Sequence, residues 1–418
     1  MRKITDWHVH SRFSRACSQN LTLENNALWC EKKGVNVLGT ADFTHPEWFG
    51  EIESKLIEDE PGLYKLKDGR FSDMRYMLTT EVSQIYKKND KTRRIHNLIL
   101  APSIETVRKT NKWLADAGFN LKADGRPILG LDSEELYKRL KDIDERTVLI
   151  PAHAWTPWFS VFGSKSGFDS LEECFGSMAE HVFAIETGLS SDALMNRSCS
   201  MLDKVAVISN SDAHSPEKFG REANVFDVAQ NEFSFDGFMN VLRARDQKKF
   251  LYTIEFYPEE GKYHVDGHAD CGVALDPSET KKLGGLCPKC KRPLTIGVMS
   301  RVADLHDREV TSIPNNHVPQ KSIVPLPEIL AEIYNVASPS SKKVKAMYES
   351  MITNLGNEFH ILLDASISDI KTFAGDDIAE AIRRVRAGEM SITPGYDGVY
   401  GKVKIFKKNE RKQKIPLF

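Results

Sequence analysis

Metal-binding side chains follow a series of short apolar segments, and this pattern limits the folds open to the first half of the chain. The apolar segments run from Lys3 to Trp7, Val35 to Thr40, Tyr76 to Thr80, Val148 to Ala152 and Val205 to Asn210. The candidate ligands at or after their ends are His8, His10, Asp42, Glu81, His96, His153, Asp212 and His214. Residues at the carboxyl ends of barrel strands gather at one face of the barrel. We therefore expect these ligands to line one cavity.

Stretches with helical periodicity separate or follow the apolar segments. They run from Thr106 to Ala117, Ser133 to Lys141, Ser170 to His181 and Asp236 to Arg245. Alternating strands and helices are typical of a parallel sheet or barrel. Because the ligands stand at strand ends, we predict an α/β fold with a distorted TIM-like barrel of seven β/α units. The chain becomes polar and glycine-rich after Tyr257, so we assign residues 1–255 to the barrel.

The candidate ligands together suit a polynuclear metal site. Any single histidine among them is explained as well by an isolated surface or core position, but the ordered set favours a shared site. Imidazoles and carboxylates can hold two or three divalent ions (Mg, Mn or Zn), with Glu81 or Asp212 as the bridging ligand. Paired ions suit the hydrolysis of a phosphate ester, because they polarise the phosphate and generate hydroxide from water. We assign catalytic roles to Glu81, Asp212 and His153.

A second metal signature lies in residues 256–300. His268 and Cys271 are separated by two residues, as are Cys287 and Cys290, and fifteen residues lie between the two pairs. Two such pairs on a small hairpin supply four ligands to one tetrahedral structural zinc ion. His264 is a competing fourth ligand, although the spacing favours His268. Free thiols packed in a core are the alternative explanation.

The remaining residues, 301–418, predict a small, mainly helical DNA-binding domain. The expected helices run from Pro327 to Asn335, Lys342 to Thr353 and Asp376 to Ala387. Basic residues gather at Lys342, Lys343 and Lys345, at Arg383, Arg384 and Arg386, and in the tail from Lys402 to Lys414. Each cluster alone is explained equally well as a solvated face. Three clusters in one domain favour contacts with a phosphate backbone.

The overall charge leaves room for regional basic surfaces only. The chain has 57 basic and 59 acidic residues, which excludes a globally basic nucleic-acid binder. It has no apolar run of 18 residues and no apolar core of a signal peptide near its start, so we expect a soluble cytoplasmic protein with no membrane contact. Seven cysteines, three of them close to histidines, favour reduced thiols and metal ligation over a disulfide framework.

With these residues identified, residues 1–255 resemble the polymerase and histidinol phosphatase (PHP) family of metal-dependent phosphoesterases. The matching positions, in order, are His8-x-His10, Glu81, His96, His153 and Asp212-x-His214. The resemblance implies a distorted barrel with a trinuclear site. Two positions depart from the family pattern: Thr40-Ala41-Asp42 replaces Thr-Asp-His, and the region of Ala16-Cys17 lacks the expected histidine. Asp42 can replace the histidine in a third site with His214, while His45 either adds a ligand or only flanks the site.

The whole chain, with a barrel, a zinc ribbon and a helical domain, resembles the endonuclease Q family of DNA-repair nucleases. The resemblance rests on residues 39–46, 151–158, 186–190, 263–268 and 324–328. It implies cleavage of the phosphodiester on the 5′ side of a deaminated base (hypoxanthine, uracil or xanthine) or of an abasic site. DNA is then the substrate, and other DNA-repair or replication proteins are candidate partners.

Two loops beside the expected metal ligands are candidates for substrate binding. One contains Trp155 and Trp158, directly after His153, and the other contains Gly188 and Ser190. Backbone amides near Gly188 and Ser190 could donate to the oxygen that deamination introduces into a base. For the two tryptophans, burial against the barrel rim competes with base stacking.

Three other functions fit parts of the pattern. A small-molecule phosphatase uses the same barrel metals but needs neither a zinc ribbon nor a basic tail. A DNA exonuclease also uses them, and only an endonuclease nicks a closed circle at an internal lesion. A non-catalytic DNA-binding module is the third, and the near-complete ligand series speaks against it.

Overall fold

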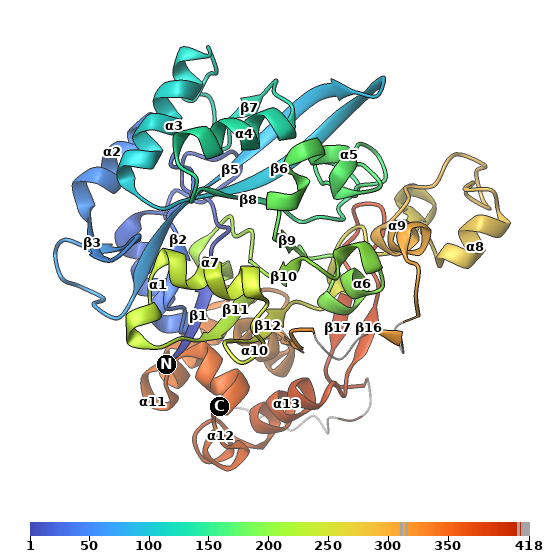
Figure 1. The fold of residues 1–418 in the computed structure, drawn as a ribbon. Coiled ribbons are helices and arrows are strands. Elements are labelled where there is room, and N and C mark those ends of the chain that lie inside the picture. The colour runs from blue at the N-terminus through green and yellow to red at the C-terminus, as the bar shows by residue number, and fades with distance from the viewer. Residues whose placement is uncertain (310–311, 314–316, 408–409, 411–418) are drawn as a thin grey trace.

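The computed structural model describes residues 1–309, 312–313, 317–407 and 410, and it has a mixed α/β fold (Figure 1). Eleven strands form one sheet in the order β15-β12-β11-β1-β2-β5-β4-β3, with β6 and β7 paired to β5 and β8 paired to β6. The strands of this sheet are β1 Arg2–Asp6, β2 Val37–Gly39, β3 Leu56–Glu60, β4 Leu63–Leu66, β5 Arg75–Lys88, β6 Lys91–Ala101, β7 Ile128–Leu129, β8 Val148–Pro151, β11 Ala223–Asp227, β12 Phe250–Glu255 and β15 Gln320–Ser322. Three two-stranded sheets complete the strands: β9 Ala184–Glu186 with β10 Ala206–Ile208, β13 Asp266–His268 with β14 Val273–Leu275, and β16 Ser391–Thr393 with β17 Lys402–Lys404.

The prediction of an all-parallel sheet is wrong. β1, β2 and β5 are parallel neighbours, but β5 pairs antiparallel with β6, β6 with β8, and β1 with β11. The long β5–β6 hairpin turns at Asn89 and Asp90, which have φ values of 53° and 55°. Two residues with positive φ form the kind of tight turn that joins antiparallel strands, and Asn and Asp tolerate this conformation better than most residues.

Backbone hydrogen bonds bring together strand ends that the main sheet does not join. Ala154 N donates to Glu186 O at 2.9 Å, Thr187 N to Ile208 O at 3.0 Å, and His10 N to Ala213 O at 3.1 Å. These bonds connect the ends of β8, β9, β10 and β1 in that order. The ends that carry the candidate ligands are therefore gathered at one place.

Polar side chains cap the first turn of several helices in the N-terminal half. The helices of this half are α1 Leu23–Lys33, α2 Pro46–Lys55, α3 Ile104–Asp116, α4 Ser133–Ile143, α5 Leu171–Phe175, α6 Ala193–Arg197 and α7 Phe235–Ala244. Side chains of Ser103, Asp132 and Ser234 cap α3, α4 and α7, whose bounds lie close to the predicted helices. The predicted helix from Ser170 to His181 instead breaks after α5, at Gly176 with φ of 49°, and continues as a 3₁₀ turn.

After β12 the chain leaves the large sheet, forms the β13–β14 hairpin with α8 Pro277–Lys282 and α9 Val298–Leu305, and then returns. β15 pairs in parallel with β12 at the sheet edge. The C-terminal helices follow, and Figure 1 shows α10 to α13 below the sheet and α8 projecting from the side of the molecule. Their bounds are α10 Leu326–Tyr334, α11 Lys342–Leu355, α12 Ile367–Ala374 and α13 Asp376–Ala387. The three helices predicted here are present, and α12 was not predicted.

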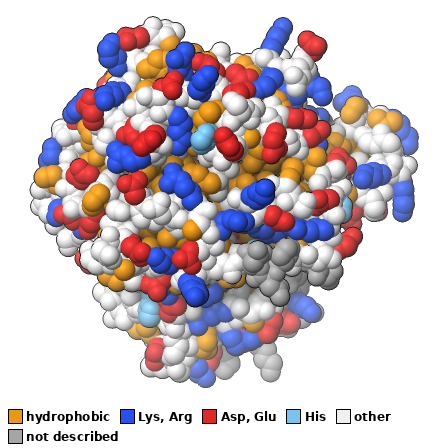
Figure 2. All heavy atoms as spheres, viewed as in Figure 1, with side chains coloured by type: hydrophobic (Ala, Val, Ile, Leu, Met, Phe, Trp, Pro, Cys, Tyr) orange, Lys and Arg blue, Asp and Glu red, His pale blue; other side chains and the backbone are white. Residues whose placement is uncertain are grey.

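The described surface carries mixed charge. On the face shown in Figure 2, acidic and basic side chains are interspersed, in keeping with the net charge of −2. No helix among the described residues is long and apolar enough to cross a bilayer.

Candidate metal centre

Two clusters of possible ligands share one carboxylate, Glu81. His8, His10, Glu81 and Asp212 form the first cluster, and Glu81, His96 and His153 form the second. In each cluster the ligand atoms lie within 4.8 Å of one another. One oxygen of Glu81, Oε1, lies 2.7 Å from His96 Nδ1 and 3.2 Å from His153 Nε2. The other oxygen, Oε2, lies 3.6 Å from Nε2 of both His8 and His10, so Glu81 faces each cluster with a different oxygen.

The strands place these side chains by register. In the β5–β6 hairpin Glu81 pairs with Leu98 and Ser83 pairs with His96. Because alternate residues of a strand point to the same face, Glu81 and His96 are diagonal neighbours on one face. His153 and Asp212 follow β8 and β10 with φ values of 31° and 47°. A positive φ at a residue other than glycine is strained, and such positions often mark functional sites.

Buried carboxylates orient the two histidines that follow β1. Nδ1 of His8 lies 3.0 Å from both oxygens of Glu186, which directs Nε2 of His8 toward Glu81 and Asp212. Nδ1 of His10 lies 3.5 Å from Oδ1 of Asp42, while its Nε2 lies 2.9 Å from Asp212. Carboxylates behind histidine ligands are a common feature of metal sites, because they hold the ring orientation and tautomer.

The centre has the chemistry of a cation site. Within the described residues, Nε2 of His8 is buried and has no hydrogen-bond partner. Because buried polar atoms normally have a partner, this nitrogen is a candidate to bind a metal ion. Burial lowers the pKa of His96 to about 4, so its imidazole is neutral, which is the form that binds a metal. Burial also lowers the pKa of His10, but hydrogen bonds to Asp212 and Asp42 outweigh this effect and raise it to about 9. The carboxylates thus favour positive charge between them.

Three other predicted ligand positions lie outside the two clusters. Asp42 is fully buried, and its Oδ2 accepts hydrogen bonds from Ser11 N, Ser11 Oγ and Ser14 Oγ at 2.6–2.8 Å. His214 is partly exposed, and its ring lies 4.6 Å from that of His10. His45 is buried at the start of α2, with its ring stacked on Phe13 at 4.2 Å. Asp42 therefore supports the loop that carries His10.

Two residues of the centre were missed by the sequence analysis. Glu186 ends β9 and accepts from the backbone N of His153 at 2.7 Å as well as from His8. Arg126 reaches in from the loop before β7, and its Nη1 lies 3.0 Å from Glu81 Oε2. The Arg126 side chain keeps a quarter of its surface exposed, so it lies at the opening of the centre. Nothing local distinguishes Arg126 from the many other basic residues of the chain.

The two tryptophans predicted to contact substrate differ in position. Trp155 is 1% exposed, its Nε1 donates to Asn196 Oδ1 at 2.7 Å, and its ring packs against Phe162. The Trp155 ring therefore lies in the apolar core, which is the buried position that the sequence analysis gave as the alternative to base stacking. Trp158 is 37% exposed and meets Tyr263 edge-on at 5.5 Å, so it remains available at the surface.

Gly188 packs directly against the ligand His153. Its φ is +70°, and a Cβ at this position lies 2.5 Å from His153 Cβ. Ser190 is buried, and its carbonyl accepts from His264 Nδ1 at 3.3 Å. Since a contact below 3.0 Å forces a shift, a larger residue at position 188 displaces His153 itself. The loop thus supports the metal centre, whatever it does toward substrate.

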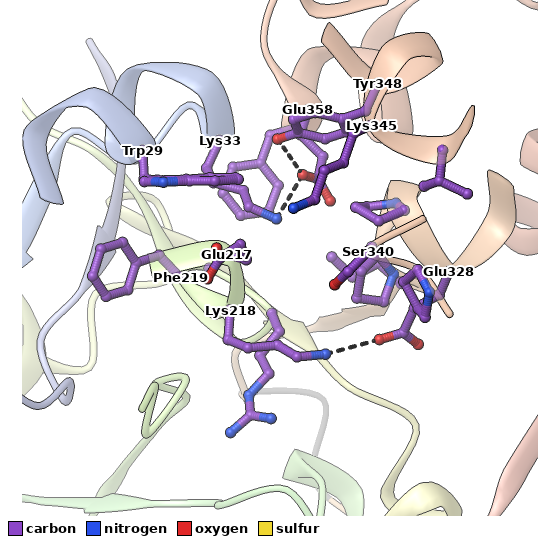
Figure 3. A pocket seen from close by; sticks show the side chains of 18 of the residues that line it. Trp29, Lys33, Glu217, Lys218, Phe219, Glu328, Ser340, Lys345, Tyr348 and Glu358 are labelled. Atoms are coloured by element: carbon purple, nitrogen blue, oxygen red, sulfur yellow. Dashed lines mark hydrogen bonds and ion pairs between the residues drawn. The ribbon is translucent and has the colours of Figure 1, made fainter. Parts of the chain in front are cut away.

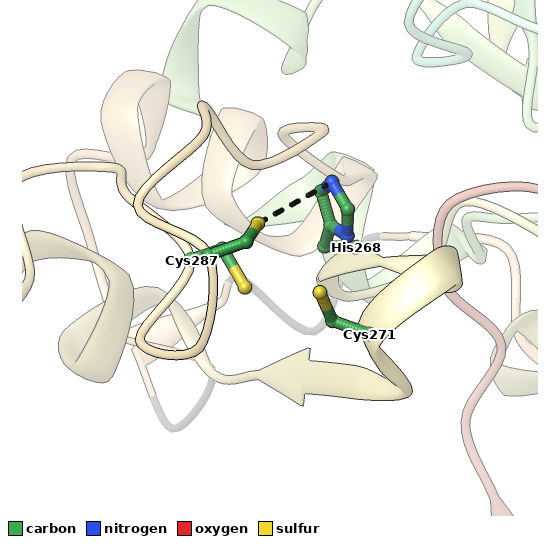
Figure 4. A group of neighbouring side chains, drawn as sticks. His268, Cys271 and Cys287 are labelled. Atoms are coloured by element: carbon green, nitrogen blue, oxygen red, sulfur yellow. Dashed lines mark hydrogen bonds between the residues drawn. The ribbon is translucent and has the colours of Figure 1, made fainter.

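The candidate zinc ligands form a third cluster, separate from the two clusters that share Glu81. His268, Cys271, Cys287 and Cys290 offer ligand atoms within 4.8 Å of one another. Figure 4 shows the labelled side chains of His268, Cys271 and Cys287 converging from the hairpin and the following loop. His264, the competing ligand, instead faces Ser190. Val273, Cys287 and Leu294 form a very small apolar cluster beside these ligands.

The basic clusters differ in how far their charge is used within the chain. Arg383 pairs with Glu380 and Glu389, and Arg384 pairs with Glu380 and Glu410. Arg386 donates to two backbone carbonyls. The arginine cluster is therefore largely structural. Much of the basic tail (Lys408, Arg411, Lys412 and Lys414) lies outside the described residues.

Two solved structures are similar to this chain over nearly its whole length. The crystal structure of the lesion-specific endonuclease PfuEndoQ from Pyrococcus furiosus matches with a TM-score of 0.84 and 28% identity, over 97% of this chain and 95% of that one. Endonuclease Q in complex with a 27-mer duplex that carries an abasic lesion at its active site matches with a TM-score of 0.86 and 29% identity, over 99% of both chains. The chain is thus similar to endonuclease Q over nearly its whole length. The resemblance inferred from the sequence is thus confirmed.

Two sequence relatives of this chain are uncharacterised proteins. YqxK of Bacillus subtilis is 29% identical over 97% of this chain and 100% of its own length. MJ0043 of Methanocaldococcus jannaschii is 32% identical over 253 residues, which are 60% of this chain and only 31% of MJ0043. Residues 325–389 match the family described as the MJ0043 C-terminal domain. The C-terminal helices α10 to α13 make up most of that segment.

Proposed function

We propose that this chain is a DNA-repair endonuclease that hydrolyses the phosphodiester on the 5′ side of a deaminated base or an abasic site. The observation that carries the proposal is the shared carboxylate of Glu81, which faces one histidine cluster with each oxygen. The whole-length likeness to endonuclease Q, solved with an abasic duplex, supplies the class of substrate. Within this proposal, residues 1–255 act as a PHP-type barrel, 256–300 as a zinc ribbon and 301–418 as a DNA-binding domain.

The two clusters provide for two divalent ions. His8, His10 and Asp212 would hold one, His96 and His153 would hold the other, and Glu81 belongs to both clusters. Such a pair supplies Lewis acidity and an activated water at the phosphate. Glu186 and Asp42 keep His8 and His10 oriented with Nε2 toward the ions. Asp42 has no place in either cluster, so the two clusters account for two ions rather than three.

Arg126 contributes charge to the phosphate in this proposal. Its guanidinium pairs with Glu81 Oε2, the oxygen that faces His8 and His10, and its side chain lies at the opening of the centre. A cation held by Glu81 would compete with Arg126 for the charge of this carboxylate. A positioned guanidinium there binds a phosphate oxygen and stabilises the negative charge that develops during displacement.

The lesion is read outside the stacked duplex. A base paired inside DNA is hidden from the centre, so the damaged nucleotide is flipped out, which costs a few kcal/mol and less at a mismatch or abasic site. The loop of Gly188 and Ser190 lies beside His153 and is the part of the protein best placed to meet the flipped residue. Trp158, the exposed tryptophan next to the same ligand, contacts the displaced strand or base.

The zinc cluster has a structural role in this proposal. Four ligands of the His-Cys₃ type close the coordination shell and leave no position for water. The residues around these four ligands, between residues 264 and 297, form a small lobe. Because the apolar cluster of this lobe is very small, binding of zinc provides much of its folding free energy. The ordered lobe then orients the duplex.

A closed circular duplex with one uracil, hypoxanthine or abasic site tests the function. Metal-loaded protein is expected to nick the circle once, 5′ to the lesion, while an undamaged circle stays closed. Glu81→Gln removes the shared carboxylate and is expected to abolish nicking, whereas Glu180→Gln, on an exposed side chain, leaves it unchanged. Degradation that needs a free DNA end identifies an exonuclease instead, and release of phosphate from small esters alone identifies a phosphatase.

A further inference from the structure

A cavity of the described chain lies between the α/β half and the C-terminal helices. Its volume is about 400 Å³, and its walls come from α1, from residues 217–221, and from α10 and α11 with the residues that flank them. Pockets of 300–1,000 Å³ are typical of small-molecule sites. Figure 3 shows the labelled side chains of Trp29, Lys33 and Lys345 around this space. None of the metal ligands lines it.

The base of the cavity is a fixed polar network. Glu358 is 3% exposed, and its Oε2 accepts from Tyr348 at 2.9 Å and pairs with Lys33 Nζ at 2.6 Å. Its Oε1 accepts from Leu326 N at 3.0 Å. Because every partner is held in place, the cavity is preformed and needs little ordering to bind a ligand.

The charges around the cavity suit a ligand with one anionic end. Lys33 pairs with Glu358, Lys218 pairs with Glu328, and Glu349 pairs with Lys32, so these charges are compensated. Lys345 forms no ion pair within the described residues, and Figure 3 shows its amine directed into the same space as that of Lys33. Glu217 is the remaining acidic residue of the wall, and it accepts hydrogen bonds from hydroxyl or amino groups.

The rest of the wall is apolar and partly aromatic. Trp29, Phe219, Val344 and Phe359 line it together with three prolines. Flat rings pack well against such walls, while a phosphate finds a donor in Lys345. We infer that this cavity binds a nucleotide unit, with its phosphate at Lys345, whose charge is not compensated within the described residues, and its base against the aromatic wall. The choice of ligand deepens the proposed function, because the unit is either a free mononucleotide or one nucleotide of a DNA strand.

A direct connection links the cavity to the metal centre. Arg221, in the wall segment, donates from Nε to Ser211 O at 2.9 Å and from Nη2 to Asp212 O at 3.4 Å. The buried carboxylate of Asp6 joins the same two segments, because it accepts from Ser211 N and Gly220 N. Hydrogen bonds thus join the wall segment directly to the segment that carries Asp212.

Calorimetric titration with deoxyadenosine monophosphate tests the inference. One molecule is expected to bind per chain, and Lys345→Ala or Ser340→Trp is expected to weaken binding at least about tenfold. Ser340 is exposed at the cavity, so its replacement fills the space without disturbing the core. Lys342→Ala, on the same helix but outside the cavity, is the matched control. Glu81→Gln is expected to keep binding, which separates this site from the metal centre and from the proposed nuclease activity.

A second measurement distinguishes the two sources of the nucleotide. If Lys345→Ala and Ser340→Trp weaken binding of an abasic duplex but the free mononucleotide does not bind, the ligand is a nucleotide of the strand. If the free mononucleotide binds and duplex affinity is unchanged, the ligand is a free nucleotide. The inference is overturned if neither binding reaction responds to these substitutions, or if Lys342→Ala has the same effect as Lys345→Ala.

Discussion

The Nδ1 atom of His8 lies 3.0 Å from both carboxylate oxygens of Glu186, and both side chains are fully buried. The same carboxylate accepts from the backbone N of His153, a residue of the other cluster. Glu186 thus orients one residue of each cluster, His8 in the first and His153 in the second. A centre of this kind depends on residues that never touch a metal.

Glu186→Gln is expected to lower the affinity of the first ion about 10- to 100-fold, because a neutral amide orients and polarises His8 less well than a carboxylate. Calorimetric titration of the metal-stripped protein with Mn²⁺ measures the change. Glu180→Gln, at an exposed side chain, is the control. An unchanged Mn²⁺ affinity in Glu186→Gln contradicts the assigned role.

Arg126→Lys is expected to leave Mn²⁺ affinity unchanged or raise it, since the substitution weakens the ion pair that competes for Glu81. Cleavage of a lesion duplex is expected to slow by a factor of about 10²–10³, because lysine lacks the planar fork that binds phosphate oxygens. Single-turnover cleavage and metal titration are measured on the same protein. Loss of metal binding together with cleavage shows instead that Arg126 only maintains the structure of the centre.

Gly188→Ala is expected to weaken metal binding as well as stability, because the new Cβ lies 2.5 Å from His153 Cβ. The matched control is Gly118→Ala, where φ is also positive, at +86°, but a Cβ meets no atom within 4 Å. Both variants are expected to lose about 1 kcal/mol or more of unfolding free energy through backbone strain. Only Gly188→Ala is expected to reduce Mn²⁺ affinity, and equal metal affinity in the two variants removes the proposed support of His153.

Cys287→Ser is expected to reduce the bound zinc by one ion per chain and to unfold the lobe around it, because little apolar core remains there. Elemental analysis gives the zinc content, and limited proteolysis reports order between residues 264 and 297. Cys199→Ser, at a buried thiol outside the three clusters, is expected to retain the zinc. Full zinc content in Cys287→Ser means that the ligand set is wrong.

Stability is expected to fall as pH rises, owing to two buried acids behind the centre. Burial raises the pKa of Glu255 to about 8, and the negative charge of Asp192 adds to the effect. Burial and the negative charge of Glu255 also raise the pKa of Glu222. A raised pKa means that the folded state favours the protonated acid, so its stabilising contribution is full below the ordinary value near 4.5 and is lost as pH rises through 8. Urea unfolding between pH 5 and 9, with chelator present, measures this trend. Glu255→Gln is expected to flatten the trend, and an identical pH dependence in the variant contradicts the assignment.

Local sequence was enough to predict much of this protein. The order and spacing of His8, His10, Glu81 and Asp212 are set by ligand chemistry, and the two pairs of zinc ligands by the geometry of a tetrahedral site. Helices such as α11 and α13 were predicted because amphipathic periodicity and capping residues are local features. The resemblance to endonuclease Q was likewise recognised from short stretches of sequence, such as residues 39–46 and 151–158.

Tertiary structure alone decided the remaining features. The antiparallel pairings of β6 with β8 and of β1 with β11 join segments that are far apart in the chain. Glu186 and Arg126 join the centre, and Trp155 leaves the surface for the core, because of contacts between residues far apart in the chain. The residue types and their spacing in the sequence indicate which side chains can bind a metal or a phosphate. Strand register and packing decide which of these side chains lie close together, and the energies of register and packing are summed over the whole molecule.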